Sequence, residues 1–145
     1  MKYFKCGNCK TPYKIDETKI NNTQINVKCN KCGANNIIRF GPVLIAQKKD
    51  WVQQYNLKIG ENTIGRKSKT PEASIIIYDE YISRKHAVIE LENIDNKLFI
   101  SFKDLSSLNG SFNKSKIRLK SNLKYPFVPG DYFIIGLTKL TLKFN

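Results

Sequence analysis

The sequence has a single histidine, few acidic residues and no apolar run long enough to cross a membrane. Its 145 residues contain 12 Asp and Glu against 25 Lys and Arg. The longest apolar runs, Pro42–Ala46 and Tyr132–Leu137, are far shorter than a membrane span. With one histidine, no paired carboxylates and no phosphate-binding loop, the sequence offers little for a catalytic site. We therefore expect a binding protein with no catalytic residues, and not an enzyme.

The N-terminal segment lacks the apolar stretch that directs secretion. We therefore expect no membrane partner and a cytoplasmic location, where thiols stay reduced. Four cysteines, all within residues 1–40, then need a role other than disulfide formation.

No segment shows a sustained 3.6-residue apolar period, so helices are not expected. Short alternating segments, separated by turn sequences such as Asn109-Gly110, instead favour a β-sandwich. The predicted strands are Val52–Ile59, Asn62–Gly65, Ser74–Ile77, His86–Glu92, Leu98–Asp104, Ser111–Phe112, Lys116–Arg118, Tyr132–Ile135 and Lys139–Phe144. We predict an all-β protein with a small unit over residues 1–40, a linker over 41–51 and a sandwich over 52–145.

The cysteines form two C-x2-C pairs, Cys6 with Cys9 and Cys29 with Cys32. A zinc ion takes four thiolates at the corners of a tetrahedron, and each such turn supplies two of them. Four protein ligands leave no open position, so this spacing predicts one structural zinc ion per chain. Iron can occupy the same four sulfurs, and free or redox-active thiols are the alternative without a metal. Because the unit is too small for a large core, the metal should supply its folding free energy.

The region around these cysteines resembles the short zinc ribbons at the N-termini of many bacterial regulatory proteins. The resemblance covers residues 1–40 and rests on the two cysteine pairs together with Tyr13, Ile15-Asp16, Ile20, Val27-Lys28 and Gly33. The sequence departs from it at Lys10, where such a turn often has glycine. We expect some strain in the first turn but no loss of a ligand.

Three motifs follow one another in the second part of the chain: Ile64-Gly65-Arg66, Ser83-Arg84-Lys85-His86, and the segment from Asp104 to Asn113. In this order and spacing, they resemble the forkhead-associated (FHA) domain over about residues 52–145. Each motif alone has a plainer explanation, since Asn-Gly is commonly just a hairpin turn. The resemblance implies an eleven-stranded β-sandwich whose loops at one end bind a phosphothreonine peptide, and therefore a threonine-phosphorylated protein as partner.

The residues of these motifs suit a phosphate ligand. Arg66 is a permanent cation with a planar fork, and Ser83 can donate its hydroxyl. By resemblance, Arg84 adds a second contact and Asn109 pairs with the peptide main chain. Structural roles are implied for Gly65, His86, Gly110 and Asn113.

Two positions depart from the family pattern. A Thr or Ser that also contacts the phosphothreonine commonly precedes the Asn, but here that position is Leu108, with Ser107 one residue earlier. We expect either weaker binding or a contact from Ser107. Tyr81 stands where some members carry a charge that selects the third residue after the phosphothreonine. An aromatic side chain there predicts that the protein prefers an apolar residue at this peptide position.

Positive charge is concentrated near the N-terminus, where residues 1–49 hold ten Lys and Arg and two Asp and Glu. The leading hypothesis is a phosphothreonine-binding adaptor with a structural zinc site. The alternative is a regulator that binds nucleic acid through the basic ribbon under phosphopeptide control. Few aromatics for base stacking, with Tyr3, Phe4 and Tyr13 among them, argue against this alternative.

Overall fold

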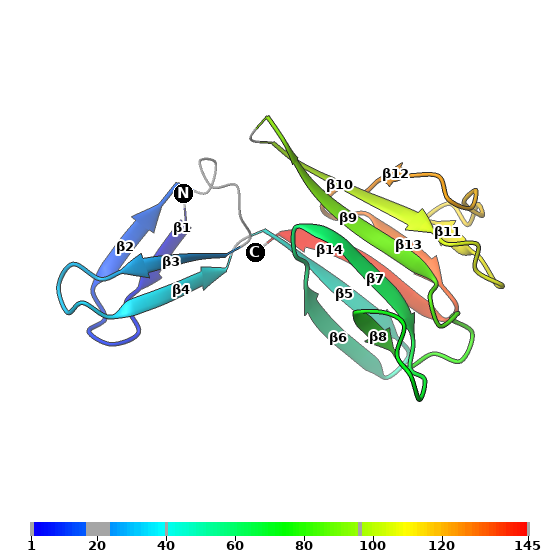
Figure 1. The fold of residues 1–145 in the computed structure, drawn as a ribbon, viewed down its shortest axis with the longest axis horizontal. Helices are drawn as coiled ribbons and strands as arrows, with labels where there is room; N and C mark the ends of the chain where they lie inside the picture. Colours follow the sequence, from blue (N-terminus) through cyan, green and yellow to red (C-terminus); the bar gives the residue numbers. More distant parts are fainter. Residues whose placement is uncertain (1, 17–23, 40, 96, 145) are drawn as a thin grey trace.

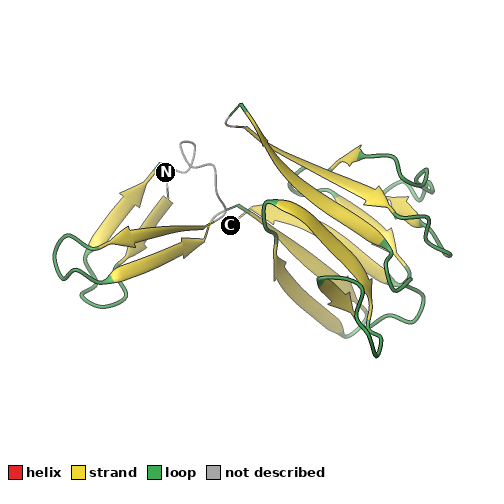
Figure 2. Ribbon diagram, viewed as in Figure 1, coloured by secondary structure: helices red, strands yellow, loops and turns green. Residues whose placement is uncertain are grey.

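The structure is a computed structural model that describes residues 2–16, 24–39, 41–95 and 97–144. Every regular element within these ranges is a β-strand (Figure 2), which confirms the all-β fold class. Within the same ranges, no helix is present that could span a membrane.

Two short hairpins form the N-terminal ribbon (Figure 1). Their strands are β1 (Lys2–Lys5), β2 (Pro12–Ile15), β3 (Gln24–Lys28) and β4 (Asn35–Arg39). Side chains alternate between the two faces, so Phe4 stacks on Tyr13 at 5.4 Å between ring centroids, while Tyr3 and Lys14 stay exposed. Ile20, part of the ribbon pattern, lies outside the described residues.

Two five-stranded sheets form the second part of the chain. The first has the order β12 (Tyr125–Pro126), β10 (Lys97–Asp104), β9 (Ala87–Ile94), β7 (Gly60–Arg66) and β8 (Ile75–Ile77). The second has the order β11 (Ser111–Asn113), β13 (Tyr132–Ile135), β14 (Thr138–Phe144), β5 (Pro42–Lys48) and β6 (Trp51–Asn56). Pairing is antiparallel throughout except between β7 and β8, which are parallel.

The core lies between the two sheets. Alternate residues of each strand point inward, as Ile89 and Leu91 of β9 do, at no more than 1% exposure. At its centre Phe102 stacks on Phe133 at 4.4 Å, and Phe127 meets both rings edge-on. Burying one such side chain contributes about 1.5–3 kcal/mol, so this part of the chain has a core of its own.

The predicted linker over residues 41–51 is wrong. Residues 42–48 form β5, which pairs with both β14 and β6, and Trp51 begins β6. The run Pro42–Ala46 is mostly buried, as its apolar composition requires, and it lies between two neighbouring strands instead of crossing the surface as a connector. The domain limits themselves stay a prediction.

Two short elements also differ from expectation. Lys116–Arg118 contributes a single bridge, from Arg118 to Phe112, instead of a strand. The two-residue strand β12 was not predicted, because Tyr125-Pro126 is too short to show any alternation. The described sandwich thus has ten strands and one isolated bridge, where the family resemblance implied eleven strands.

Several loops converge at one end of the sandwich, the right-hand end in Figure 1. The loop between β8 and β9 contacts the end of β7, the loop between β10 and β11, and the turn between β13 and β14. This end carries all the predicted peptide-binding residues. We call it the loop end.

Candidate functional site

The four cysteine sulfurs of the ribbon all lie within 4.8 Å of one another. The Sγ atoms of Cys6 and Cys32 are 3.6 Å apart, as are those of Cys9 and Cys29. These distances are far longer than a disulfide bond of about 2.05 Å. They match the sulfur separation of about 3.8 Å that follows from tetrahedral zinc with bonds of about 2.3 Å. The donor set therefore fits a tetrahedral metal ion.

The two cysteine turns share one backbone pattern. In each, the N–H four residues after the first cysteine donates to that cysteine's carbonyl: Lys10 to Cys6, and Gly33 to Cys29, both at 2.9 Å. Both donors have left-handed backbone, with φ of 62° at Lys10 and 78° at Gly33. A side chain in this region costs about 1–2 kcal/mol, so the strain expected at Lys10 is present.

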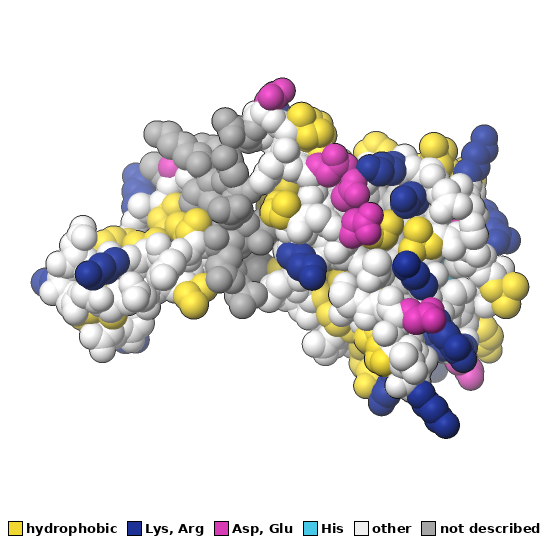
Figure 3. All heavy atoms as spheres, viewed as in Figure 1, with side chains coloured by type: hydrophobic (Ala, Val, Ile, Leu, Met, Phe, Trp, Pro, Cys, Tyr) yellow, Lys and Arg dark blue, Asp and Glu magenta, His cyan; other side chains and the backbone are white. Residues whose placement is uncertain are grey.

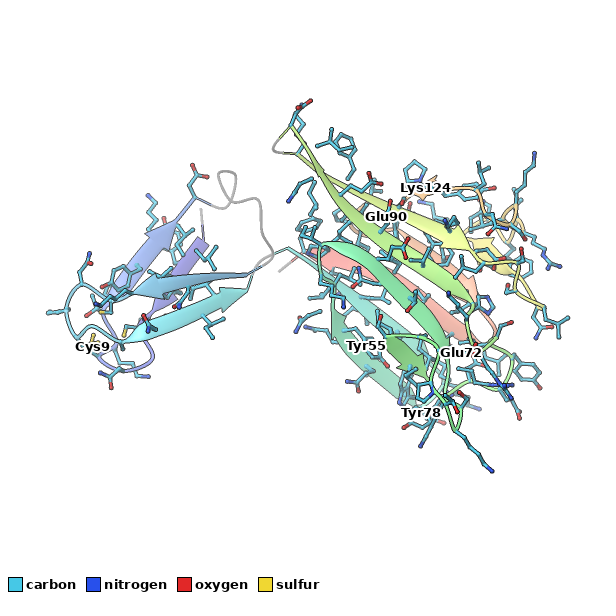
Figure 4. All side chains as sticks on the ribbon, viewed as in Figure 1. Cys9, Tyr55, Glu72, Tyr78, Glu90 and Lys124 are labelled. Carbon is cyan, nitrogen blue, oxygen red and sulfur yellow. The ribbon has the colours of Figure 1, made fainter. Side chains whose placement is uncertain are left out.

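Neighbouring groups donate to the sulfurs (Cys9 is labelled in Figure 4). The Tyr13 hydroxyl donates to Cys29 Sγ at 3.0 Å, and this bond, together with backbone N–H donors of the same turn, lowers the pKa of that thiol to about 6. Thr11 Oγ1 lies 3.0 Å from Cys9 Sγ, and Asn36 Nδ2 lies 3.5 Å from Cys6 Sγ. Donors of this kind favour the thiolate, the form that binds a metal.

At the loop end, the backbone of residues 83–86, in the loop after β8, packs directly against the end of β7. A Cβ atom at Gly65 would lie 1.8 Å from the carbonyl oxygen of Arg84, so only glycine fits. The Arg66 N–H donates to Ser83 O at 3.0 Å, and the His86 N–H also donates to β7. Because Gly65 has no side chain, the backbone of Ser83 can lie next to that of Arg66.

His86 is fully buried and connects two loops. Its Nδ1 accepts from the Ser83 N–H at 3.1 Å, so its Nε2 carries the proton and donates to Gly110 O at 3.0 Å. Burial lowers the pKa of this imidazole below its ordinary value. The ring is therefore neutral and has no nitrogen facing solvent, which is the geometry of a structural brace.

Asp104, at the end of β10, anchors the next loop and received no role from the sequence. Its Oδ1 accepts from the hydroxyls of Ser107 and Ser111 at 2.5 and 2.6 Å, and its Oδ2 accepts from the Ser107 N–H at 3.0 Å. Burial alone would raise the pKa of this carboxyl, but the bonds from Ser107 and Ser111 outweigh it and leave the pKa below its ordinary value.

The expectation of a peptide contact from Ser107 is therefore corrected. Its side chain is buried, and its hydroxyl donates to Asp104 and not to the surface. Leu108, one residue later, is 85% exposed. In front of Asn109, the surface therefore consists of main-chain atoms and the Leu108 side chain, which has no hydroxyl.

Groups able to bind a ligand remain free at the surface of the loop end. Ser83 Oγ accepts from the Leu108 N–H at 3.2 Å, which leaves its hydroxyl hydrogen able to donate. The half-exposed Arg66 makes one long contact, from Nη1 to Glu80 O at 3.5 Å. Arg84 is exposed beside them. Figure 3 shows basic side chains over this end of the sandwich on the face drawn.

Asn109 bridges two loops through its amide, which donates to Tyr81 O at 2.9 Å. One of the two amide hydrogens is thereby occupied, and the side-chain carbonyl can accept from a ligand N–H. Tyr81 itself is 49% exposed. Asn113 lies one loop away, and its Oδ1 accepts from the N–H groups of Ser115 and Ile117.

Asp79 is a second buried residue that the sequence analysis missed. Its carboxylate accepts from the Tyr81 N–H at 2.9 Å, and from the Leu137 N–H and the Thr138 hydroxyl, both at 2.8 Å. It therefore holds the loop of Tyr81 against the turn between β13 and β14. No local pattern pairs residues 58 positions apart, so only the folded chain shows this link.

Comparisons with known proteins agree with this architecture. The family model described as the FHA domain matches residues 62–136, and the model described as a zinc-ribbon domain matches residues 3–35. No curated protein gives a significant match.

Three solved structures illustrate the shared fold. Yeast Pml1 is 22% identical, with a TM-score of 0.66 over 74% of this chain and 81% of that chain. The MEK1 FHA domain, solved with a phosphothreonine peptide of HOP1, is 22% identical, with a TM-score of 0.57 over 70% and 96%. The FhaA FHA domain, solved with the intracellular domain of Rv3910, is 20% identical, with a TM-score of 0.56 over 71% and 100%. With an FHA model matching half of its length, this chain belongs to the FHA domain family and carries an N-terminal zinc ribbon.

Proposed function

We propose that this protein is a non-enzymatic adaptor whose loop end binds a phosphothreonine peptide. The observation that carries the proposal is the placement of Arg66 and Ser83 on hydrogen-bonded backbone, with donors still free. MEK1, which shares the fold, was solved with a phosphothreonine peptide, which supports the same ligand class here.

A phosphate group suits this set of donors. It carries nearly two negative charges at pH 7 and three acceptor oxygens. Arg66 offers charge-assisted hydrogen bonds, Ser83 offers one hydroxyl hydrogen, and Arg84 adds a second cation. Because Gly65 and His86 hold these residues in place before binding, little conformational entropy is lost when the peptide binds.

The surroundings suit an extended peptide. Asn109 can accept a peptide N–H while its amide keeps the bond to Tyr81 O. Tyr81 and Leu108 expose apolar surface next to the donors, and we propose an apolar preference at peptide positions near the phosphothreonine.

In the ribbon we propose one structural zinc ion held by Cys6, Cys9, Cys29 and Cys32. Bound there, the metal joins the two hairpins and takes no part in a reaction, because four thiolates complete its coordination. All four cysteines are free of disulfides, which fits a reducing compartment such as the cytoplasm.

Calorimetry with four versions of one peptide tests the function. The peptide is first selected from a phosphothreonine library, and the four versions carry phosphothreonine, phosphoserine, threonine or glutamate at the central position. We expect binding only of the phosphorylated forms, with phosphoserine about fourfold weaker for lack of the threonine methyl. Equal affinity for the threonine and phosphothreonine versions contradicts the proposal.

A further inference from the structure

Arg118 lies against the loop that carries Leu108 and Asn109. A Cβ atom at Gly110 would lie 2.5 Å from Arg118 Nε and 2.9 Å from its Cζ, so the guanidinium packs directly on the glycine backbone. Its Nη2 also donates to Ser107 O at 3.4 Å. Gly110 thus leaves room for a cation at the base of this loop.

The backbone of Arg118 is held by the turn that precedes it. Asn113 Oδ1 caps this turn by accepting two N–H groups, and the Asn113 N–H donates to Ile117 O at 3.0 Å. Arg118 itself bridges to Phe112. A long side chain that starts from fixed backbone and packs on fixed backbone loses less entropy when it binds a ligand.

The positive charge of Arg118 is not neutralised within the described residues. No ion pair of its guanidinium occurs among them, whereas Lys124 pairs with Glu90 on the sheet face (both labelled in Figure 4). The carboxylate of Asp104, at the start of the same loop, is buried and already accepts from Ser107 and Ser111. Arg118 is exposed, and among the described residues its guanidinium donates only to Ser107 O, which leaves further N–H groups for a ligand.

We propose that Arg118 binds a second anionic group of the phosphopeptide, the carboxylate of an Asp or Glu a few residues from the phosphothreonine. The inference rests on the proposed function and adds a sequence preference to it. Arg118 contacts the base of the loop at Ser107 and Gly110, whereas Ser83 contacts it at Leu108. A peptide lying over the loop from Ser83 therefore approaches Arg118 with a neighbouring residue. A planar guanidinium matches a carboxylate with two parallel hydrogen bonds.

A peptide scan combined with substitution tests this assignment. One glutamate is moved through five positions on each side of a phosphothreonine in an otherwise neutral peptide, and affinities are measured by fluorescence anisotropy at fixed salt. We expect glutamate at one or two adjacent positions to raise affinity for the wild-type protein about fivefold. This gain disappears in Arg118→Gln and is only partly kept in Arg118→Lys, which retains the charge but not the fork.

Lys97→Ala is the matched control, because it removes one exposed charge at the far end of β10, about 23 Å from the loop end. It should keep the whole gain. The assignment is overturned if Arg118→Gln weakens neutral and acidic peptides equally, which would place the guanidinium on the phosphothreonine itself. It is also overturned if Arg118→Gln changes the affinity for neither the neutral nor the acidic peptides. Failure of the wild-type protein to bind any phosphothreonine peptide instead refutes the proposed function, and this inference with it.

Discussion

The ribbon and the sandwich are both built from short antiparallel strands, yet they are held together by different means. Within residues 3–16 and 25–38 of the ribbon, only Cys6 and Cys29 are buried, and the other side chains are half-buried or exposed. The sandwich buries a continuous apolar cluster between two sheets. We therefore expect the ribbon to depend on its proposed metal ion and the sandwich on its core, so the two should fail under different conditions.

Removing the metal should produce the largest effect. Structural zinc contributes on the order of 10 kcal/mol in units of this kind, so chelation should unfold the two hairpins of the ribbon while the sandwich keeps its structure. Amide exchange by NMR before and after chelation measures both parts at once. Joint loss of protection in both parts would show that the ribbon and the sandwich form one cooperative unit.

Phe102→Ala should give the opposite result. The ring is fully buried and stacks on Phe133, so its loss should destabilise the sandwich by about 3–5 kcal/mol. Zinc content, measured by elemental analysis, should stay near one ion per chain. Loss of zinc together with unfolding of the sandwich would contradict the expectation that the two parts are stabilised independently.

Acid should weaken the sandwich through His86. Its pKa is lowered by burial in the folded state, so the unfolded chain binds the extra proton more readily. Stability is therefore full above the ordinary histidine pKa of about 6.5 and declines as pH falls below it. Urea unfolding between pH 8 and pH 5 measures the decline, and His86→Gln should remove it. An unchanged slope in that variant would assign the proton to another group.

Lys10→Gly should produce the smallest effect, which is a gain in the stability of the ribbon. Relief of the left-handed strain at φ 62° should stabilise the ribbon by up to about 1 kcal/mol and raise zinc affinity up to about fivefold. Gly33→Ala is the matched control, since it introduces the same strain in the second turn at φ 78°. Zinc competition titrations should move in opposite directions for the two variants. Movement in the same direction would refute this account of the turns.

The sequence was most informative where chemistry is local. Two C-x2-C pairs predict a compact sulfur cluster because each turn places two ligands within four residues. The pattern of the FHA motifs likewise predicted the sandwich and located the loops near Arg66 and Ser83. The all-β fold and both family assignments are confirmed.

Sequence reasoning failed where long-range contacts decide. Strand β5 looks like a connector until β14 and β6 are seen on either side of it. Ser107 is a local exception, because its acceptor Asp104 lies only three residues away and the sequence did not show that the hydroxyl points inward. Asp79 and Arg118 act through partners that no local spacing brings together, so neither could be assigned a role from the sequence.

The most direct test of the central claim is the affinity of one library-selected phosphothreonine peptide for the wild-type protein and for Arg66→Ala, measured by calorimetry. We expect a loss of at least about thirtyfold, because two charge-assisted hydrogen bonds disappear. Thermal unfolding should be unchanged, and Lys97→Ala should bind like the wild type. Wild-type affinity in a folded Arg66→Ala protein would instead place the phosphate away from the loop end.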